Sequence, residues 1–128
     1  MNEALSKQEW AVMETLWKNS PLFLSQLMEE MADKVDWNSS SYLTYLKRMT
    51  EKGYICFKTV SGNRCYFPVV RREDCIESER DHILSKLTDS SARLLLVSMI
   101  EKCGLAENDR DELAALITKL CEDAERKE

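Results

Sequence analysis

Hydroxyl and cationic side chains gather in one short stretch of the chain, residues 38–53. At helical spacing they fall on one side of it, with the hydroxyls first and the cations last. Such groups hydrogen-bond the base edges and phosphates of DNA, so the stretch predicts a DNA-recognition helix; an ordinary amphipathic helix is the alternative. We expect four side chains toward base edges, Ser40, Leu43, Thr44 and Lys47, and two near phosphates or at the groove edge, Ser41 and Arg48.

The residues at the two ends of this stretch are those that start and stop a single helix. Asn38 and the serines after it are favourable N-cap residues, and Gly53 is a favourable helix end. The side opposite the hydroxyls is apolar, so we expect it to face the core. Its residues, at positions i, i+3, i+4 and i+7, are Tyr42, Tyr45, Leu46 and Met49.

Two helices are expected before this stretch. The first begins at Ser6, which has the spacing of a capping box with Glu9, and an Asn-Ser-Pro sequence stops it. Residues 22–24 form a short extended piece. Ser25 is the expected cap of a second helix, which runs to about Lys34.

The periodicity changes from helical to extended after the recognition stretch. Residues 54–60 and 64–70 are rich in aromatic and β-branched side chains and flank a turn at residues 61–63, which predicts a β-hairpin. Pro68 cannot donate a ladder hydrogen bond, so its strand is expected at an edge or to finish near there. Three helices and a basic hairpin follow the order of a winged helix-turn-helix. The wing residues expected to touch the DNA backbone are Lys58, Asn63 and Arg64.

Charge is distributed unevenly along the 128 residues, whose formal net charge is −5. Residues 1–72 hold ten Lys or Arg and eight Asp or Glu, whereas residues 73–128 hold eight and fifteen. Attraction to phosphate reaches only about a Debye length, roughly 8 to 10 Å. The local balance of charges, and not the net charge of the whole chain, therefore decides which part can bind DNA. We therefore predict a DNA-binding domain over residues 1–71 and a domain without that role over residues 72–128.

The acidic part is predicted to form three further helices, over residues 73–87, 92–102 and 107–126, with residues 89–91 capping the second of them. Three such helices make a thin core alone, and pairing with a second copy would bury far more. We predict a homodimer; completion of a monomeric core is the alternative. The residues expected at the dimer contact are Leu94, Leu95, Val97, Met99, Ile100, Leu113, Leu116, Ile117 and Leu120.

The five cysteines are scattered and lack a C-x-x-C pair, and the single His82 is not at metal-site spacing from any of them. We expect no metal or other cofactor. Buried free thiols are predicted, with reactive or redox-sensing thiols as the alternative. Across the hairpin, Cys56 and Cys65 are expected to face each other.

Other classes of protein are poorly supported. No G-x-S-x-G motif or glycine-rich phosphate loop occurs, and the chain has only three glycines, so an enzyme is not expected. No apolar run reaches about 18 residues, and the start lacks a basic region followed by an apolar stretch. We expect a cytoplasmic protein without a membrane partner.

Several motifs of the chain resemble those of one family. The most specific is Glu9-Trp10-x-Val12-Met13-x-x-x-Trp17; the others are Asp36-Trp37, Thr44, Arg48, Lys52-Gly53-Tyr54-Ile55 and Glu101-Lys102. From about Leu5 to Leu120 the chain resembles the penicillinase repressors, methicillin-resistance regulators and copper-transport repressors. The resemblance implies a dimeric winged-helix repressor of resistance genes and of its own gene. It also implies a membrane sensor-protease, whose signal leads to cleavage in the fifth helix and releases the DNA.

Two departures from the family pattern concern specificity and release. Where the family's recognition helix often carries a lysine and an arginine, this chain has Ser40 and Leu43, so a different operator is expected. A leucine offers only apolar contact, for instance to a thymine methyl. The Asn-Phe cleavage pair aligns with Ser98 and Met99, and metal-free induction or an unrelated signal is the alternative to cleavage. The C-x-C motifs of the copper-sensing branch are missing.

These features together predict a mainly α protein with a small β-hairpin wing, built as a winged helix-turn-helix DNA-binding domain and a C-terminal three-helix dimerisation domain. The predicted function is sequence-specific transcriptional repression by a homodimer on a pseudo-palindromic operator. Operator DNA, a second copy and a sensor-protease system are the expected partners. A winged-helix module that binds protein without specific DNA binding is the alternative.

Overall fold

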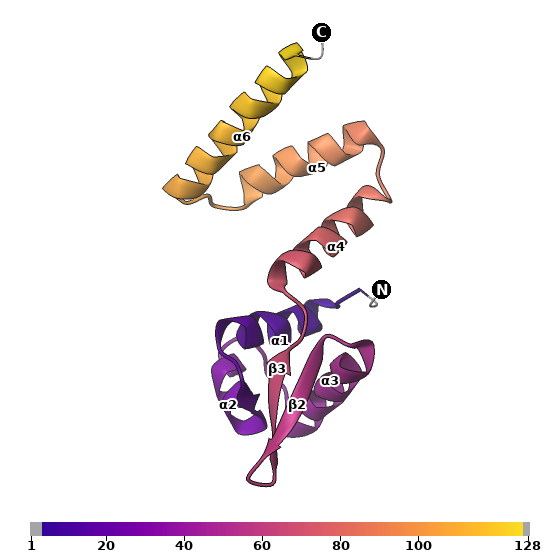
Figure 1. Cartoon of the computed structure of the whole chain (residues 1–128), viewed down its shortest axis with the longest axis vertical. Helices are drawn as coiled ribbons and strands as arrows, with labels where there is room; N and C mark the ends of the chain where they lie inside the picture. The colour runs from indigo at the N-terminus through magenta and orange to yellow at the C-terminus, as the bar shows by residue number, and fades with distance from the viewer. Residues whose placement is uncertain (1–3, 127–128) are drawn as a thin grey trace. The chain divides into compact units, whose positions relative to one another are not determined.

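The structure, a computed structural model, describes residues 4–126 and the side chains of residues 4–124. Its elements are α1 (Lys7–Lys18), β1 (Leu22–Phe23), α2 (Leu24–Met31), α3 (Ser39–Lys52), β2 (Ile55–Val60), β3 (Asn63–Pro68), α4 (Arg72–Leu84), α5 (Asp89–Lys102) and α6 (Glu107–Arg126) (Figure 1). Contacts divide the chain into two compact units, up to Ile83 and from Leu84. The mainly helical fold with a hairpin wing is as predicted, and the predicted domain boundary after residue 71 stays a prediction.

The first unit contains an antiparallel sheet of order β1-β3-β2. Val60 pairs with Asn63, so the hairpin turn consists of Ser61 and Gly62, both at positive φ (53° and 82°), as a two-residue type I′ turn requires. The predicted three-residue turn is therefore one residue too long, since Asn63 already belongs to β3. Pro68 is the last residue of β3, as expected, but that strand is central rather than at an edge.

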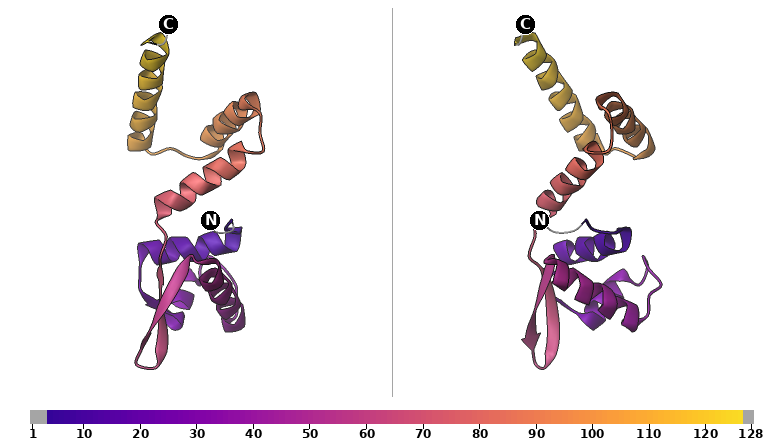
Figure 2. Two further views of the ribbon diagram at one scale, coloured as in Figure 1. Left: turned by 45° about the vertical axis from the view of Figure 1, so that its right-hand side comes forward. Right: turned by 90° about the vertical axis from the view of Figure 1, so that its right-hand side faces the viewer.

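The core of the first unit lies where α1, α2 and α3 meet the sheet. Fully buried side chains come from all three helices, and the start of β2 closes one side of the cluster. The indole N–H of Trp17 donates to the Val70 carbonyl at 3.0 Å, which ties α1 to the segment after β3. The hairpin extends past the helices at its turn, beside α3 (Figures 1 and 2).

The capping box that starts α1 is confirmed. Ser6 Oγ accepts from the Glu9 N–H at 3.2 Å, and Glu9 Oε1 accepts from the Ser6 N–H at 2.9 Å. The expectation for α2 is wrong at both ends, because Phe23 is the N-cap residue and the helix stops at Met31. Phe23 pairs with Cys65 of β3 and keeps an extended backbone (φ −73°, ψ 161°), so the helix begins directly after it, at Leu24.

Two boundaries of the later helices also differ from expectation. α4 ends at Leu84, three residues earlier than predicted. The expected cap of α5 at residues 89–91 is wrong, because Thr88 is the cap: its hydroxyl oxygen accepts from the Ser91 N–H at 3.3 Å, so the helix begins three residues early, at Asp89. Both views in Figure 2 show α5 and α6 diverging from the loop that joins them.

The expectation for the cysteines is wrong in two respects. Only Cys65 and Cys75 are buried; Cys56, Cys103 and Cys121 are exposed. The hairpin register pairs Cys56 with Phe67, and Cys65 with Lys58, so the two cysteines do not face each other. Among the described residues, no group of three or more His, Cys, Asp or Glu side chains has the geometry to hold a metal ion. None of the helices in residues 4–126 is long and apolar enough to cross a membrane.

Candidate nucleic-acid interface

α3 is fixed at both ends by the residues that punctuate it in the sequence. Asn38 Oδ1 accepts from the Ser41 N–H at 2.8 Å, and Gly53 takes the left-handed conformation (φ 86°) that a side chain would disfavour. Tyr42, Leu46 and Met49 are buried, as predicted. Tyr45 is half-buried at the edge of this face and does not belong to the core.

The side of α3 turned away from the core carries the predicted contact residues. Four polar ones, Ser40, Thr44, Lys47 and Arg48, are exposed, and Ser41 is half-buried at the edge. Leu43 is 48% exposed, a large apolar surface in such a setting. The Thr44 hydroxyl donates to the Ser40 carbonyl at 3.0 Å, which leaves the hydroxyl oxygen free to accept a hydrogen bond.

A groove separates α3 from the hairpin, and it brings helix and wing residues together. One part, of about 500 Å³, is lined by Leu43, Lys47, Phe57 and Arg64, among others. A second part, of about 660 Å³, shares Leu43 and Arg64 and reaches Asn63, the hairpin turn and the start of α2. No local pattern predicts that the start of α2 lines this groove, because only the sheet pairing brings it there.

Lys58 is the one predicted wing residue that this groove does not include. Side chains alternate between the two faces of a strand, and Lys58 is directly opposite Cys65 rather than Arg64. Its ammonium lies 5.8 Å from the centre of the Phe67 ring. Any contact of Lys58 with DNA therefore comes from the other face of the hairpin.

Three predicted contact cations rest against aromatic rings. The guanidinium of Arg64 lies 4.2 Å from the Phe57 ring centre, and that of Arg48 lies 5.6 Å from the Tyr45 ring centre; Lys58 is the third. Within residues 4–124, none of the three forms an ion pair with a carboxylate. By contrast, Arg71, just before α4, and Arg80, within it, pair with aspartates. The charge of the ring-held cations is therefore left available for an outside anion.

A buried ion pair holds the C-terminal end of α3 against α1. The Lys52 ammonium lies 3.0 and 3.1 Å from the two Glu9 carboxylate oxygens, with the side chains 15% and 1% exposed. Burial alone would raise the pKa of Glu9, but hydrogen bonds from the Ser6 backbone and from Lys52 outweigh it, and the pKa lies below its ordinary value of 4.5. The two residues are 43 positions apart, so no local pattern predicted this pair.

Acid should remove the contribution of Glu9 to stability. Because the folded-state pKa is lowered, this contribution is present above pH 4.5, the unfolded value, and is lost as the pH falls through the folded-state pKa. We expect the difference in unfolding free energy between the wild type and Glu9→Gln to be constant from pH 7 to about pH 5 and to shrink below pH 4.5. Urea titrations at each pH measure it. A difference that grows as the pH falls would contradict the assignment.

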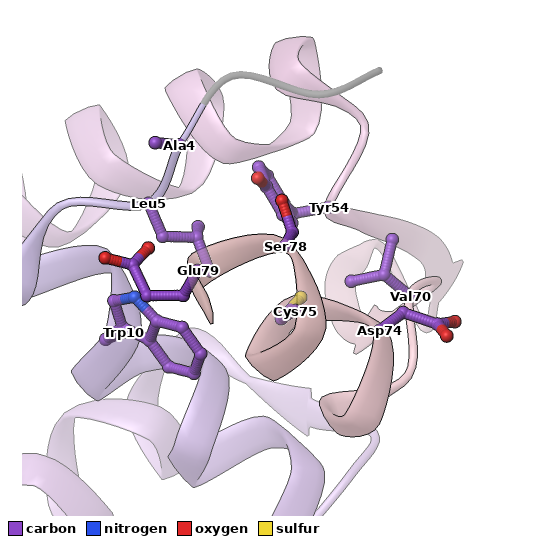
Figure 3. A pocket seen from close by; sticks show the side chains of 9 residues that line it. All are labelled: Ala4, Leu5, Trp10, Tyr54, Val70, Asp74, Cys75, Ser78 and Glu79. Atoms are coloured by element: carbon purple, nitrogen blue, oxygen red, sulfur yellow. The ribbon is translucent and has the colours of Figure 1, made fainter. Parts of the chain in front are cut away.

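A small hollow of about 60 Å³ lies elsewhere in the first unit, between α4 and the start of the chain (Figure 3). Leu5, Trp10 and Tyr54 line it around α4, on which Cys75 and Ser78 lie. Burial, followed by the nearby charge of Asp74, raises the pKa of the Cys75 thiol. A thiol kept protonated is a weak nucleophile, which argues against the redox-sensing alternative at this cysteine.

The predicted dimer residues are mostly exposed in the second unit. Large exposed apolar side chains are found on both helices, at Leu94, Leu95, Val97 and Met99 of α5 and at Leu116, Ile117 and Leu120 of α6. Ile100 and Leu113 are half-buried. Leu96 is also 56% exposed, but it is absent from the predicted dimer residues, although it lies in the same apolar run of α5. The proposed cut pair, Ser98 and Met99, is exposed within α5.

Three helices, a small antiparallel sheet and a projecting hairpin beside the third helix define a winged-helix protein. The chain belongs to the penicillinase repressor family, whose model matches residues 5–119. Members of this family are transcriptional repressors, so the expectation that the protein is not an enzyme holds.

Similar proteins agree with this classification. The chain is 24% identical over 115 residues to the methicillin resistance regulatory protein MecI of Staphylococcus aureus, covering 90% of this chain and 94% of MecI. It is 21% identical over 113 residues to the penicillinase repressor of Bacillus licheniformis, covering 88% of each. A solution structure of monomeric Bacillus licheniformis BlaI in complex with the blaP half-operator has the same fold. That structure matches with a TM-score of 0.51 and 23% identity, over 58% of this chain and 90% of that one.

Proposed function

We propose that the protein is a sequence-specific repressor that binds duplex DNA with α3 in the major groove and the hairpin along the neighbouring backbone. One observation carries the proposal: Leu43 of α3 and Arg64 of the hairpin line both of two adjoining hollows, and Lys47 of α3 lines one of them. An α-helix with its side chains is about 10–12 Å across, and the major groove is about 12 Å wide. α3 therefore fits the major groove of DNA. The basic hairpin beside α3 then reaches the phosphates of the neighbouring backbone.

The residues of this face have separate roles in the proposal. Ser40, Leu43, Thr44 and Lys47 face base edges, and Ser41, Arg48, Asn63 and Arg64 face the backbone. Thr44, whose hydroxyl proton is already used within the helix, accepts from a base amino group. Leu43 packs against a thymine methyl. Because Leu43 and Ser40 make no charged contact to guanine, the operator differs from those of relatives that carry cations there.

The second unit supplies the proposed dimer contact. Apolar side chains that are half or more exposed in the single chain, such as Leu94 at 70% and Ile117 at 53%, would be buried by a second copy. A two-fold dimer presents two α3 helices to half-sites about one helical turn, roughly 34 to 36 Å, apart. The operator is then pseudo-palindromic. We propose resistance-type genes and the protein's own gene as the targets, since the similar proteins are named for methicillin and penicillin resistance.

Release of DNA in this scheme follows loss of the second unit's dimer surface. Ser98 and Met99 lie in the C-terminal half of α5, and cutting the chain there would separate Leu94 from α6. A sensor-protease acting at this pair is the proposed signal. Such a protease would have to accept serine and methionine at the cut.

A mobility-shift titration of the full chain with DNA from upstream of its own gene tests the proposal. Binding that rests on phosphate contacts falls linearly in log affinity against log salt, with a slope of about −0.9 for each phosphate contacted. We expect a steep slope and tighter binding to this DNA than to a shuffled duplex. Affinity that hardly changes with salt would instead support the protein-binding alternative, for which the exposed Leu43 and Val60 in the groove would be the contact.

Two substitutions separate backbone contact from base reading. Arg64→Ala is expected to weaken binding to all duplexes by a similar factor and to reduce the salt slope by about 0.9. Leu43→Ala should keep the slope and change the preference among bases at one position, by about 1 kcal/mol or roughly five-fold. Competition titrations against single-base variants of the operator measure both. Identical effects of the two changes on every duplex would refute this division of roles.

A further inference from the structure

The side of α3 away from the wing carries an aromatic stack. The ring of Trp37, the residue before the N-cap, lies 4.6 Å from that of Tyr45 with an interplanar angle of 26°. Trp37 also meets the buried Tyr42 edge to face at 5.1 Å. The rings therefore connect the core to the surface, in the order Tyr42, Trp37 and Tyr45.

This stack ends at Arg48. The guanidinium lies 5.6 Å from the centre of the Tyr45 ring, one helical turn further along α3. In the part of the chain with described side chains, Arg48 pairs with no carboxylate, so the ring orients the guanidinium without neutralising its charge. Around a helix of 3.6 residues per turn, Tyr45 lies about 160° and Arg48 about 100° from Lys47. Tyr45 is thus on the far side of α3 from Lys47 and the wing groove, and Arg48 is on the flank of the exposed face next to Tyr45.

We propose that Trp37 and Tyr45 are positioning residues, which hold Arg48 against the phosphates on the wall of the major groove opposite the wing. This inference rests on the proposed function. A helix in the major groove has a phosphate wall on each side, and Arg64, held over Phe57, faces the first. An arginine that is already oriented loses less conformational freedom when it meets a phosphate, so the stack increases affinity without touching DNA itself.

Two features fit this arrangement. Tyr45 is half-buried and stacks on Trp37 instead of joining the core, and Arg48 lacks an acidic partner among the described residues. The wing repeats the arrangement with Phe57 and Arg64. Both flanks of α3 therefore present an arginine on a ring.

A double-mutant cycle on the full chain tests the inference, with fluorescence anisotropy of a labelled duplex from upstream of the gene. Tyr45→Gln is expected to weaken binding about two- to five-fold and to cause no further loss in the Arg48→Ala background. Tyr45→Phe keeps the ring and should bind as the wild type does. Arg48→Ala should lower the salt slope by about 0.9, and Tyr45→Gln should lower it in the same direction.

The cycle distinguishes positioning from a purely structural role. If Tyr45→Gln weakens binding equally in both backgrounds, or leaves the slope unchanged, Tyr45 does not act through Arg48 and the inference is wrong. If Tyr45→Gln unfolds at the assay temperature, Tyr45→Leu, which keeps an apolar side chain but has no ring, replaces it in the same cycle, with the same criteria. If the wild type binds with a steep salt slope but the cycle shows no coupling between Tyr45 and Arg48, only this inference is overturned. A wild type that shows no salt-dependent binding overturns the proposed function as well.

Discussion

Replacing Lys52 by methionine should destabilise the first unit by about 3–5 kcal/mol, the range typical of removing one partner of a buried ion pair. The Glu9 carboxylate is 1% exposed and receives the Lys52 ammonium on both oxygens. Without the lysine, Glu9 either stays ionised without that partner or binds a proton, and each costs free energy. Urea unfolding followed by tryptophan fluorescence measures the loss, because Trp10, Trp17 and Trp37 all lie in the first unit.

Two further variants make this measurement specific. Lys34→Met removes an exposed lysine and should change the unfolding free energy by no more than about 0.5 kcal/mol. Glu9→Gln combined with Lys52→Met leaves a neutral pair, and the glutamine oxygen can still accept from the Ser6 N–H. We expect the double variant to be clearly more stable than Lys52→Met alone. If Lys52→Met lowers the unfolding free energy no more than Lys34→Met does, the Glu9–Lys52 ion pair does not hold α3 in place.

A glutamate at Ile117 should convert the protein to a monomer and weaken operator binding by a factor on the order of 10² to 10⁴, the range that linking two binding modules supplies. Ile117 is 53% exposed in the single chain and lies on the leucine stripe of α6. A carboxylate there would have to be buried without a partner in the dimer. Sedimentation gives the oligomeric state, and anisotropy titrations give the affinity for full and half operators.

Thr118→Glu is the matched control, since it adds the same charge one residue further on, off the apolar stripe. It should remain a dimer with operator affinity close to that of the wild type. The monomeric Ile117→Glu variant should bind a half operator as the wild type does, because α3 and the wing are unchanged. Dimeric Ile117→Glu protein would show that α6 does not form the contact.

The predictions that the structure corrects concern residues whose positions depend on contacts with residues far away in the sequence or outside their own helix. Ser25 was expected to cap α2, but the pairing of Phe23 with Cys65 in the sheet moves the start of the helix to Leu24. Tyr45 shares the apolar face of α3 by its helical spacing, but it lies at the edge of that face, about 60° from Tyr42, and stacks on Trp37 instead of packing in the core. In both cases contacts with residues outside the helix, which its own pattern does not specify, decide the outcome.

The sequence by itself determined the elements and their order, because caps, turns and periodicity act over a few residues. The Ser6 capping box, the Asn38 and Gly53 ends of α3 and the leucine stripe of α6 were all legible in this way. Only the tertiary structure decided which side chains share a surface. It placed Arg64 in one groove with Leu43, left Lys58 on the other face of the hairpin, and joined Glu9 to Lys52 across 43 positions. Such contacts depend on how whole elements pack, and no short stretch of residues specifies that packing.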